Sequence, residues 1–303
     1  MKRDASSMEP STTTTNTTNT AATTISAVGF CGADDSVDPN LLGLISHAYP
    51  FVEFGVLFRP DKEGEPRYAS YEWVRKLSTV ASRSSPSPNE MRLAAHLCGS
   101  RVNDVLKGNG SFLSTLIDLG FQRVQINATA VNGVDTSELG SHAETLYNVM
   151  KLYAHKLQFI IQKNEETRPL WEGLLQHHKD SSSDDIGTSL LLPSNVSMLL
   201  DESKGTGMLS KSFPPPPIGY NVGYAGGIGP ENIKSVLRQI TEVVPEDRSV
   251  WVDMESSLRS TKNGVDVFDL DKCYKCISVV CASSKKSGGL NLFSHPDYLV
   301  QDL

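Results

Sequence analysis

The sequence lacks any long hydrophobic run. No stretch approaches the roughly 20 consecutive apolar residues that a membrane-spanning helix needs. Basic residues are also in the minority, with 28 Lys and Arg against 35 Asp and Glu. A nucleic-acid-binding protein needs clustered Lys and Arg to neutralise phosphates, and no basic face with interleaved aromatic residues occurs here. We therefore expect a soluble protein with no membrane or nucleic-acid partner. A small anionic ligand is compatible with this charge, because a few backbone amides can hold it.

Cysteine is too scarce for a disulfide framework, because the five residues are odd in number and dispersed in a long chain. They are Cys31, Cys98, Cys273, Cys276 and Cys281. A reducing compartment, and hence a cytoplasmic protein, is the simpler inference. The CxxC pair at 273–276 has no second pair or His at zinc-finger spacing. LDKCYKCISVV instead predicts a helix that buries Cys273 together with Ile277, and no motif requires a metal or cofactor.

Residues 1–24 differ from the rest in composition. Their Thr, Ser and Asn tract, TTTTNTTNTAATT, cannot bury enough apolar surface to offset its ordering entropy. We expect a disordered tail before a single domain over residues 25–303. MKRDASSMEP has no apolar core, so it does not resemble a secretory signal. An organellar transit peptide is the alternative, although Asp4 and Glu9 among few Arg residues disfavour it.

Short apolar runs recur from Ile25 onward at the spacing of βα units. Eight candidate strands cover residues 25–31, 51–58, 92–98, 121–127, 157–162, 196–201, 218–225 and 249–254. Helical patterns follow Pro39, Ser70 as an N-cap, and Pro230 as a first-turn proline. The alternation predicts an α/β fold, a (β/α)8 TIM barrel, with a doubly wound open sheet as the alternative. Two segments interrupt it: a polar excursion at 177–189 and a stiff FPPPPIG connection at 213–219.

Two of the strand ends carry candidate chemistry. In LLLDESKGTG, Asp201 lies at the end of a predicted strand, where the loop begins. In GYAGGIGPENI, Gly226 and Gly227 lie at the end of another predicted strand. A β/α barrel keeps its active site at this end of its strands. A Gly pair ahead of a helix lets backbone amides approach a phosphate. Asp201 could supply a proton.

Six motifs on successive predicted strands point to one family. They are GFCG, FGVLF with PRYAS, VQINA, LLDESKGTG, YAGGIGPENI and VDMESSLRS. Together they resemble the KxCG, GFxF with SPRYVS, QLHG, LLDS with GGTG, LAGGLxPENV and VDVSSGVE of phosphoribosylanthranilate isomerase, a ribulose-phosphate-binding barrel of tryptophan biosynthesis. The resemblance covers residues 25–280 as scattered motifs, and the chain is longer than the family's usual length.

The resemblance implies an Amadori rearrangement of a phosphorylated ribosyl amine without a cofactor. Asp201 would be the acid that opens the ribose ring, and Cys31 the base that takes a proton from the adjacent carbon. This chemistry requires a lowered Cys pKa and a raised Asp pKa. For substrate binding, the resemblance implies Arg67, which would hold the anthranilate carboxylate, together with Gln125, Gly205 and Gly207. For the phosphate, it implies Gly226, Gly227, Ser256 and Ser257.

The sequence also departs from the family pattern. Gly29 replaces the Lys before the Cys, Asn127 replaces the His of QLHG, and in the eighth motif Ser257 and Arg259 replace Gly and Glu. Arg259 could contact the phosphate instead. Lys163 after the fifth strand could form a Schiff base in an aldolase-like reaction, whereas His96 is expected to be a core histidine.

Three functional hypotheses follow. The first is the isomerase, favoured by Cys31, Arg67 and Asp201 together. The second is a barrel that acts on another sugar phosphate, favoured by the altered eighth motif. The third is a phosphometabolite-binding protein without catalysis. Fold alone cannot choose among them. Each predicts a small phosphorylated metabolite as partner, and the protein is expected to be a monomer or homodimer.

Overall fold

The computed structural model describes residues 24–84, 91–181, 190–203, 206–210, 212–245, 248–284 and 291–292. Apart from Thr24, which begins the first strand, the predicted tail lies outside the described residues. None of the described helices is both long and apolar enough to cross a membrane.

Eight parallel strands form a closed barrel. They are β1 (Thr24–Cys31), β2 (Val52–Phe58), β3 (Arg92–Leu97), β4 (Arg123–Ile126), β5 (Gln158–Lys163), β6 (Val196–Leu200), β7 (Asn221–Tyr224) and β8 (Ser249–Met254). Each strand pairs with the next, and β1 closes the ring by pairing with β8, where Gly29 lies opposite Asp253. This closure confirms the predicted barrel and excludes the open sheet. A short β11 (Asn291–Leu292) extends the sheet beside the amino end of β1.

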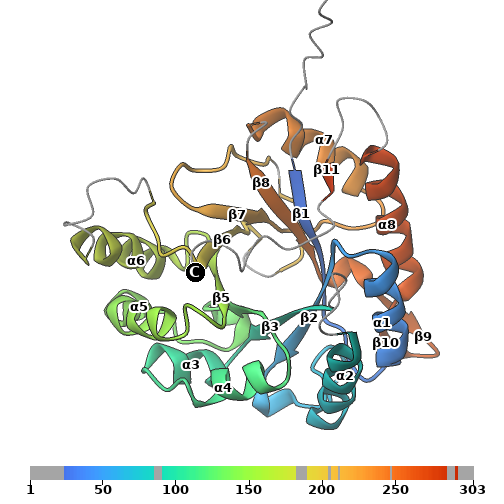
Figure 1. The fold of residues 1–303 in the computed structure, drawn as a ribbon, viewed down its shortest axis with the longest axis horizontal. Coiled ribbons are helices and arrows are strands. Elements are labelled where there is room, and N and C mark those ends of the chain that lie inside the picture. Colours follow the sequence, from blue (N-terminus) through green and yellow to red (C-terminus); the bar gives the residue numbers. More distant parts are fainter. Residues whose placement is uncertain are drawn as a thin grey trace, which may run out of the picture.

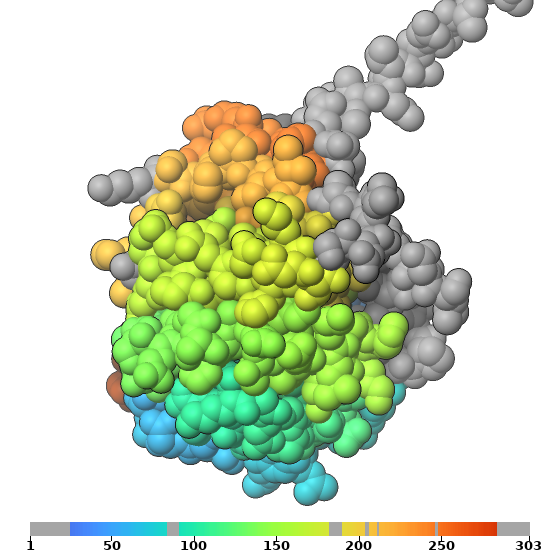
Figure 2. Space-filling model, turned by 90° about the vertical axis from the view of Figure 1, so that its left-hand side faces the viewer, coloured from blue at the N-terminus to red at the C-terminus, as the bar shows by residue number. Residues whose placement is uncertain are grey.

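Helices surround the strands, with α5 and α6 on the left of Figure 1 and α8 on the right. They are α1 (Pro39–Ala48), α2 (Tyr71–Ser84), α3 (Ser100–Leu106), α4 (Ser111–Asp118), α5 (Ala143–Leu152), α6 (Arg168–Ser181), α7 (Ile233–Val243) and α8 (Leu270–Ser284). In Figure 2 the sequence colours follow one another in bands, because each βα unit packs beside the next.

The predicted helix starts can be compared with the observed ones. Ser70 Oγ accepts a hydrogen bond from Trp73 N at 3.2 Å, so Ser70 is the N-cap of α2. The helix predicted after Pro39 is α1, and Pro39 is its first residue. The prediction for Pro230 is wrong, because α7 begins at Ile233 with Asn232 as its cap residue. Asn232 accepts from Gly229 N at 2.9 Å and donates to Gly227 O at 2.8 Å, which holds the preceding residues in a turn.

Not every unit follows the alternation. Two helices, α3 and α4, lie between β3 and β4, and in the described residues between β6 and β7 there is no helix. Phe213 and Pro214 cover that side of the barrel instead: Phe213 packs edge-on against Tyr224, whose hydroxyl donates to Pro214 O at 2.7 Å. After β8 the chain forms an antiparallel hairpin, β9 (Arg259–Lys262) and β10 (Val265–Phe268), which was not predicted.

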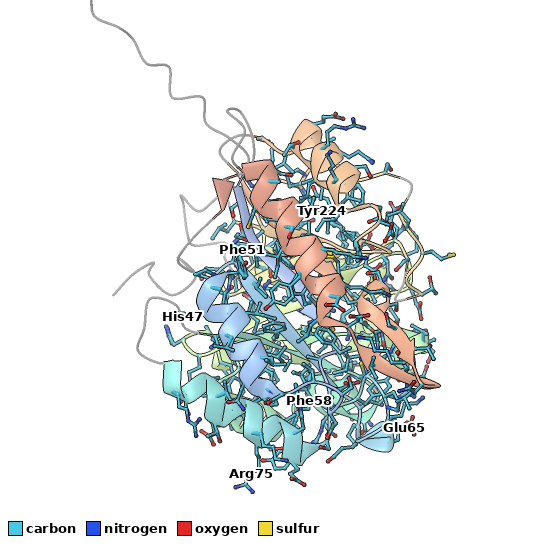
Figure 3. All side chains as sticks on the ribbon, turned by 90° about the vertical axis from the view of Figure 1, so that its right-hand side faces the viewer. His47, Phe51, Phe58, Glu65, Arg75 and Tyr224 are labelled. Atoms are coloured by element: carbon cyan, nitrogen blue, oxygen red, sulfur yellow. The ribbon has the colours of Figure 1, made fainter. Side chains whose placement is uncertain are left out.

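Figure 3 shows the two ends of the barrel, with Phe51 just before β2, Phe58 at its last position and Glu65 beyond its carboxyl end, where the β9–β10 hairpin also lies. The main core fills the space between strands and helices. A smaller cluster inside the barrel contains Leu199 and Trp251. Trp251 lies directly over Gly223, where an added Cβ would be 2.1 Å from the indole.

A buried ion pair accompanies this inner cluster. Arg123 Nη1 is 2.8 Å from Glu53 Oε1, and both side chains are almost fully buried. The Arg123 guanidinium also lies over the Trp251 ring, 4.4 Å from its centre. These large side chains occupy the inside of the barrel beneath the cavity described next.

Candidate functional site

A cavity opens at the carboxyl ends of the barrel strands. Residues at or after the ends of β2, β4, β5, β6, β7 and β8 line it. Eight of the ten predicted site residues lie in its wall: Arg67, Gln125, Asp201, Gly207, Gly226, Gly227, Ser256 and Ser257. Cys31 is not in the wall, and Gly205 lies outside the described residues.

The Gly226–Gly227 turn is held by the loop that follows β6. Both glycines have positive φ angles, 103° and 63°, which L side chains rarely adopt. A Cβ on Gly227 would lie 2.3 Å from Leu209 N, and Ser210 N donates to Gly226 O at 3.3 Å. The turn therefore requires glycine both for its conformation and for the close approach of a second backbone.

The loop after β8 packs on the same turn. A Cβ on Gly229 would lie 2.4 Å from Ser257 Cβ, and Ser257 Oγ donates to Ile228 O. Within the described chain, the amides of Gly226, Gly227, Ser256 and Ser257 donate no hydrogen bond to a protein acceptor. Backbone N–H groups of this kind can bind an anion without a cationic side chain. We call these four amides the amide rim.

Asp201 lies at the end of β6, as expected, and its carboxyl is held in place. Gln162 Nε2 donates to Oδ2 at 3.0 Å, while Ser203 N and Ser203 Oγ donate to Oδ1 at 3.1 and 2.5 Å. Both oxygens are therefore oriented by donors from β5 and from the loop after β6. The carboxyl faces the cavity as a fixed acceptor.

Asp253, which the sequence analysis missed, is a second carboxyl in the wall. It occupies the space over Gly29, where an added Cβ would lie 2.3 Å from Asp253 Oδ1. Within the described residues its carboxyl forms no hydrogen bond. Burial, followed by the charges of Glu53 and Glu255, raises the pKa of Asp253 well above its ordinary value. The carboxyl therefore retains its proton at higher pH than an exposed Asp.

Glu255 and Arg67 form an ion pair at the mouth. Arg67 Nη1 is 2.9 Å from Glu255 Oε1, and its Nη2 is 4.0 Å from Asp266 Oδ2. Arg67 also has a positive φ of 80°, and its backbone N–H donates to Asp34 Oδ2. Burial raises the pKa of Glu255, although the neighbouring Arg67 opposes that shift. Arg67 thus lines the cavity as predicted, but with protein carboxylates already beside it.

Arg259 is held by protein groups outside the cavity wall, and a phosphate contact for it stays a prediction. Its side chain is buried, with Nη2 2.7 Å from Asp34 Oδ2 and Nε 2.9 Å from Asp266 Oδ1. Nη1 donates to Gly32 O at 2.7 Å. These contacts tie the loop after β1 to the β9–β10 hairpin and leave Arg259 outside the cavity wall.

Cys31 is fully buried on the β1 side of the mouth. Its Sγ is 3.1 Å from His96 Nδ1, and it packs with Leu57 and Cys98. Burial raises the thiol pKa well above its ordinary value, and the charges of Glu255 and Asp253 add to the shift. Burial also lowers the pKa of His96 to about 4, so the imidazole is neutral near pH 7. This environment opposes a thiolate, and the role of Cys31 as a base stays a prediction.

Lys163 faces away from the central cavity. Its Nζ donates to the Tyr220 hydroxyl at 2.7 Å and lies over the Trp171 ring. It lines a separate cavity of about 340 Å³ beside α6 and Phe213. A Schiff base in the central cavity is therefore not available to Lys163.

The cysteines and acidic residues do not suggest other chemistry. None of the five cysteines forms a disulfide bond, and Cys273 is buried in α8 together with Ile277, as predicted. In the part of the chain that the structure describes, no group of three or more His, Cys, Asp or Glu side chains could hold a metal ion.

The fold and site together define a closed eight-stranded β/α barrel with a polar cavity at its carboxyl end. No protein-family model and no curated protein matches the chain. Among solved structures it is similar to the Rubisco-like protein from Rhodopseudomonas palustris, with a TM-score of 0.44 and 11% identity, covering 87% of this chain and 65% of that one.

A second similar structure is the octameric ribulose-1,5-bisphosphate carboxylase/oxygenase from Pyrococcus horikoshii OT3, with a TM-score of 0.37 and 13% identity. The match covers 76% of this chain and 54% of that one. The chain thus spans less than two thirds of either structure. Both likenesses are too weak to bear on function, and the strand pairing itself establishes the fold.

Proposed function

We propose that the cavity is the active site of an isomerase that moves a proton between neighbouring carbons of a phosphorylated sugar. The amide rim binds the phosphate, and Asp201 and Asp253 transfer protons. One observation carries the proposal: the same cavity is lined by four amides without protein acceptors and by two carboxyls in different environments.

The two carboxyls suit opposite roles. The raised pKa of Asp253, caused by burial and by the neighbouring carboxylates, favours its protonated form, so it can act as the acid. Asp201, whose oxygens are oriented by Gln162 and Ser203, can act as the base. The charge of Asp201 also contributes to the raised pKa of Asp253, so the two groups interact across the cavity. Pairs of carboxyls with different environments are a common basis for acid–base catalysis.

The reaction needs no oxidant or cofactor. The base takes the hydrogen on C2 of an open-chain aldose as a proton, and the released electron pair forms a C1–C2 double bond. The acid gives a proton to the oxygen on C1, which yields an enediol. Transfer of a proton to C1 and removal of the proton on the C2 oxygen give the ketose, and the protein returns to its starting protonation state.

The second candidate is phosphoribosylanthranilate isomerase itself. Its support is that Arg67, Asp201 and the Gly226–Gly227 turn line one cavity. It also requires Cys31 as the base, and that thiol is buried against His96. The two candidates differ in the substrate that loses a proton from carbon and in the residue that takes this proton, which is Asp201 in the first candidate and Cys31 in the second.

Hydrogen exchange would test the proposal. The protein is incubated in D₂O with ribose 5-phosphate, glucosamine 6-phosphate or phosphoribosylanthranilate, and loss of the C2 hydrogen is followed by NMR. We expect exchange with at least one ligand and a decrease of at least about 100-fold in both Asp201→Asn and Asp253→Asn. Glu138→Gln, an exposed residue in the loop before α5, is the charge-matched control.

The outcomes separate the hypotheses. Binding without exchange would favour the phosphometabolite-binding protein over an enzyme. Exchange with phosphoribosylanthranilate alone, lost in Cys31→Ala as in Asp201→Asn, would favour the second candidate. The absence of both binding and exchange would overturn the proposed function.

A further inference from the structure

Charge is distributed unevenly in the cavity wall. Asp201, Asp253 and Glu255 contribute three carboxyls, and Arg67 is the one Lys or Arg side chain among the described residues of the wall. The four amides of the amide rim, on the loops after β7 and β8, have no protein acceptor among the described residues. An anionic group is therefore stabilised at the rim, while the rest of the cavity presents carboxyl oxygens.

Arg67 is already neutralised by the protein. Glu255 Oε1 lies 2.9 Å from its Nη1, and Asp266 Oδ2 lies 4.0 Å from its Nη2. These partners come from two elements, the loop after β8 and β10, and the backbone of Arg67 is held by a third carboxylate, that of Asp34. A second anionic group on a ligand would compete with Glu255 for the guanidinium, and displacing Glu255 would leave that carboxylate in the cavity without its partner.

Asp253 has the opposite requirement. Its carboxyl reaches the cavity and forms no hydrogen bond within the described residues. A hydroxyl or amine on a ligand could donate to it or to Asp201. A carboxylate or second phosphate there would face the charge of the Asp201 carboxylate instead.

We infer that the cavity selects a ligand with a single anionic group, a sugar monophosphate whose far end carries hydroxyl or amine groups, and discriminates against ligands with a carboxylate or second phosphate at that end. The inference rests on the proposed function, in which the amide rim holds the phosphate. It assigns Glu255 as the residue that determines specificity, because it occupies the guanidinium that a second anion would use.

A matched pair of ligands tests the inference. 1-(Phenylamino)-1-deoxyribulose 5-phosphate and its 2-carboxyphenyl analogue differ only in the carboxylate, and their dissociation constants can be measured by isothermal titration calorimetry. We expect the ligand without the carboxylate to bind at least about tenfold more tightly. Where the aryl group does not fit, ribulose 5-phosphate and ribulose 1,5-bisphosphate give the same comparison at a smaller size.

Glu255→Gln should reverse the discrimination, since it frees Arg67 to bind the second anion. The ratio of the two dissociation constants is expected to move by at least about tenfold toward the carboxylated ligand. Glu138→Gln removes an exposed charge outside the wall and should leave the ratio unchanged. Circular dichroism and a thermal melt of each variant establish that it is folded.

The possible failures are distinguishable. If ribose 5-phosphate binds and the ligand with the second anion binds as tightly as its partner or more so, the inference is overturned and the proposed function stands. An unchanged ratio in folded Glu255→Gln overturns the assignment of Glu255. If no phosphorylated sugar binds, the proposed function and the inference fall together.

Discussion

On the β6–β8 side of the mouth, strand ends lead into glycine turns that leave amides and carboxyls facing a cavity. On the β1–β3 side, Cys31, His96 and Cys98 pack against one another and are almost completely excluded from solvent. Both sides carry residue types that catalysis uses. They differ in whether the neighbouring residues leave those groups accessible.

Glycine acts in opposite ways on the two sides. At Gly226 and Gly227 it allows the loop after β6 to cross close by, while the amides stay without protein acceptors. At Gly55, which lies beside Cys31 in the pairing of β1 with β2, an added Cβ would lie 2.9 Å from His96 Nε2 and 3.0 Å from Cys31 Cα. Here the missing side chain lets thiol and imidazole fill the interior. Accessibility at a strand end thus depends on what occupies the space that a glycine provides.

Gly227→Ala should have the largest effect, because it affects both conformation and packing of the open side. A positive φ costs Ala about 1–2 kcal/mol, and the clash with the Leu209 backbone adds about 1–3 kcal/mol. Gly264→Ala is the matched control, since Gly264 has a φ of 80° and nothing within 4 Å of an added Cβ. Urea unfolding measures both, and equal losses would show that Leu209 yields without cost.

His96 should make the packed side sensitive to acid. Its pKa of about 4 in the folded protein lies below the ordinary 6.5, because burial disfavours the charged imidazolium. Between these values only the unfolded chain takes up the proton. The contribution to stability is therefore complete above pH 6.5 and is lost as the pH falls toward 4, by about 3 kcal/mol in all.

Urea unfolding at several pH values between about 7 and 4.5 measures this loss. His96→Gln should flatten the pH dependence relative to the parent protein, whereas His155→Gln, at an exposed residue, should not. A pH dependence unchanged in His96→Gln would mean that the imidazole is not buried as a neutral group. Comparing how steeply the free energy of unfolding changes with pH in the three proteins removes the contribution of the carboxyl titrations, which all three share.

The sequence predicted the barrel because buried parallel strands are short apolar runs that need no partner to be recognised. All eight expected strands are present, and several of their bounds differ by only one to three residues. The β9–β10 hairpin had a signal that was overlooked: Asn263-Gly264 has φ angles of 53° and 80°, as the preferred two-residue hairpin turn requires.

The site was predictable only in part. Motif positions at strand ends brought Asp201, Gly226 and Gly227 to one cavity, because strand ends in a barrel share one rim. The environments were not predictable, since they depend on residues far apart in the chain. Asp34, which pairs with the buried Arg259, lies 225 positions from it in the sequence. His96, which contacts Cys31, lies 65 positions from it. Asp253 was missed because nothing local distinguishes an inward-facing carboxyl over Gly29 from a surface one.

Asp253→Asn should stabilise the fold while it abolishes exchange. The carboxyl has a raised pKa in the folded protein because it is buried near other acids, so ionisation near pH 7 opposes folding. A neutral amide removes that cost, and single stabilising substitutions commonly contribute about 0.5–2 kcal/mol. The gain should shrink as the pH falls through the ordinary Asp pKa of 3.8, because below it the parent carboxyl is protonated in both states. A thermal melt at pH 7 that shows destabilisation would contradict the assigned environment.

Cys31→Ala provides the smallest and sharpest comparison, because the family resemblance predicts a catalytic base at a thiol that the structure packs against His96. If the thiol is only packed against His96, its removal should lower the rate of C2 hydrogen exchange by less than about tenfold, or about 1.4 kcal/mol in the barrier. Asp253→Asn, which changes a carboxyl in the cavity wall, should lower it by at least about 100-fold. Equal losses in two folded variants would instead mean that the β1 side opens when ligand binds and that the thiol reaches the sugar. The ratio of the two rates, measured on the same ligand, therefore decides whether the packed side of the mouth takes part in the chemistry.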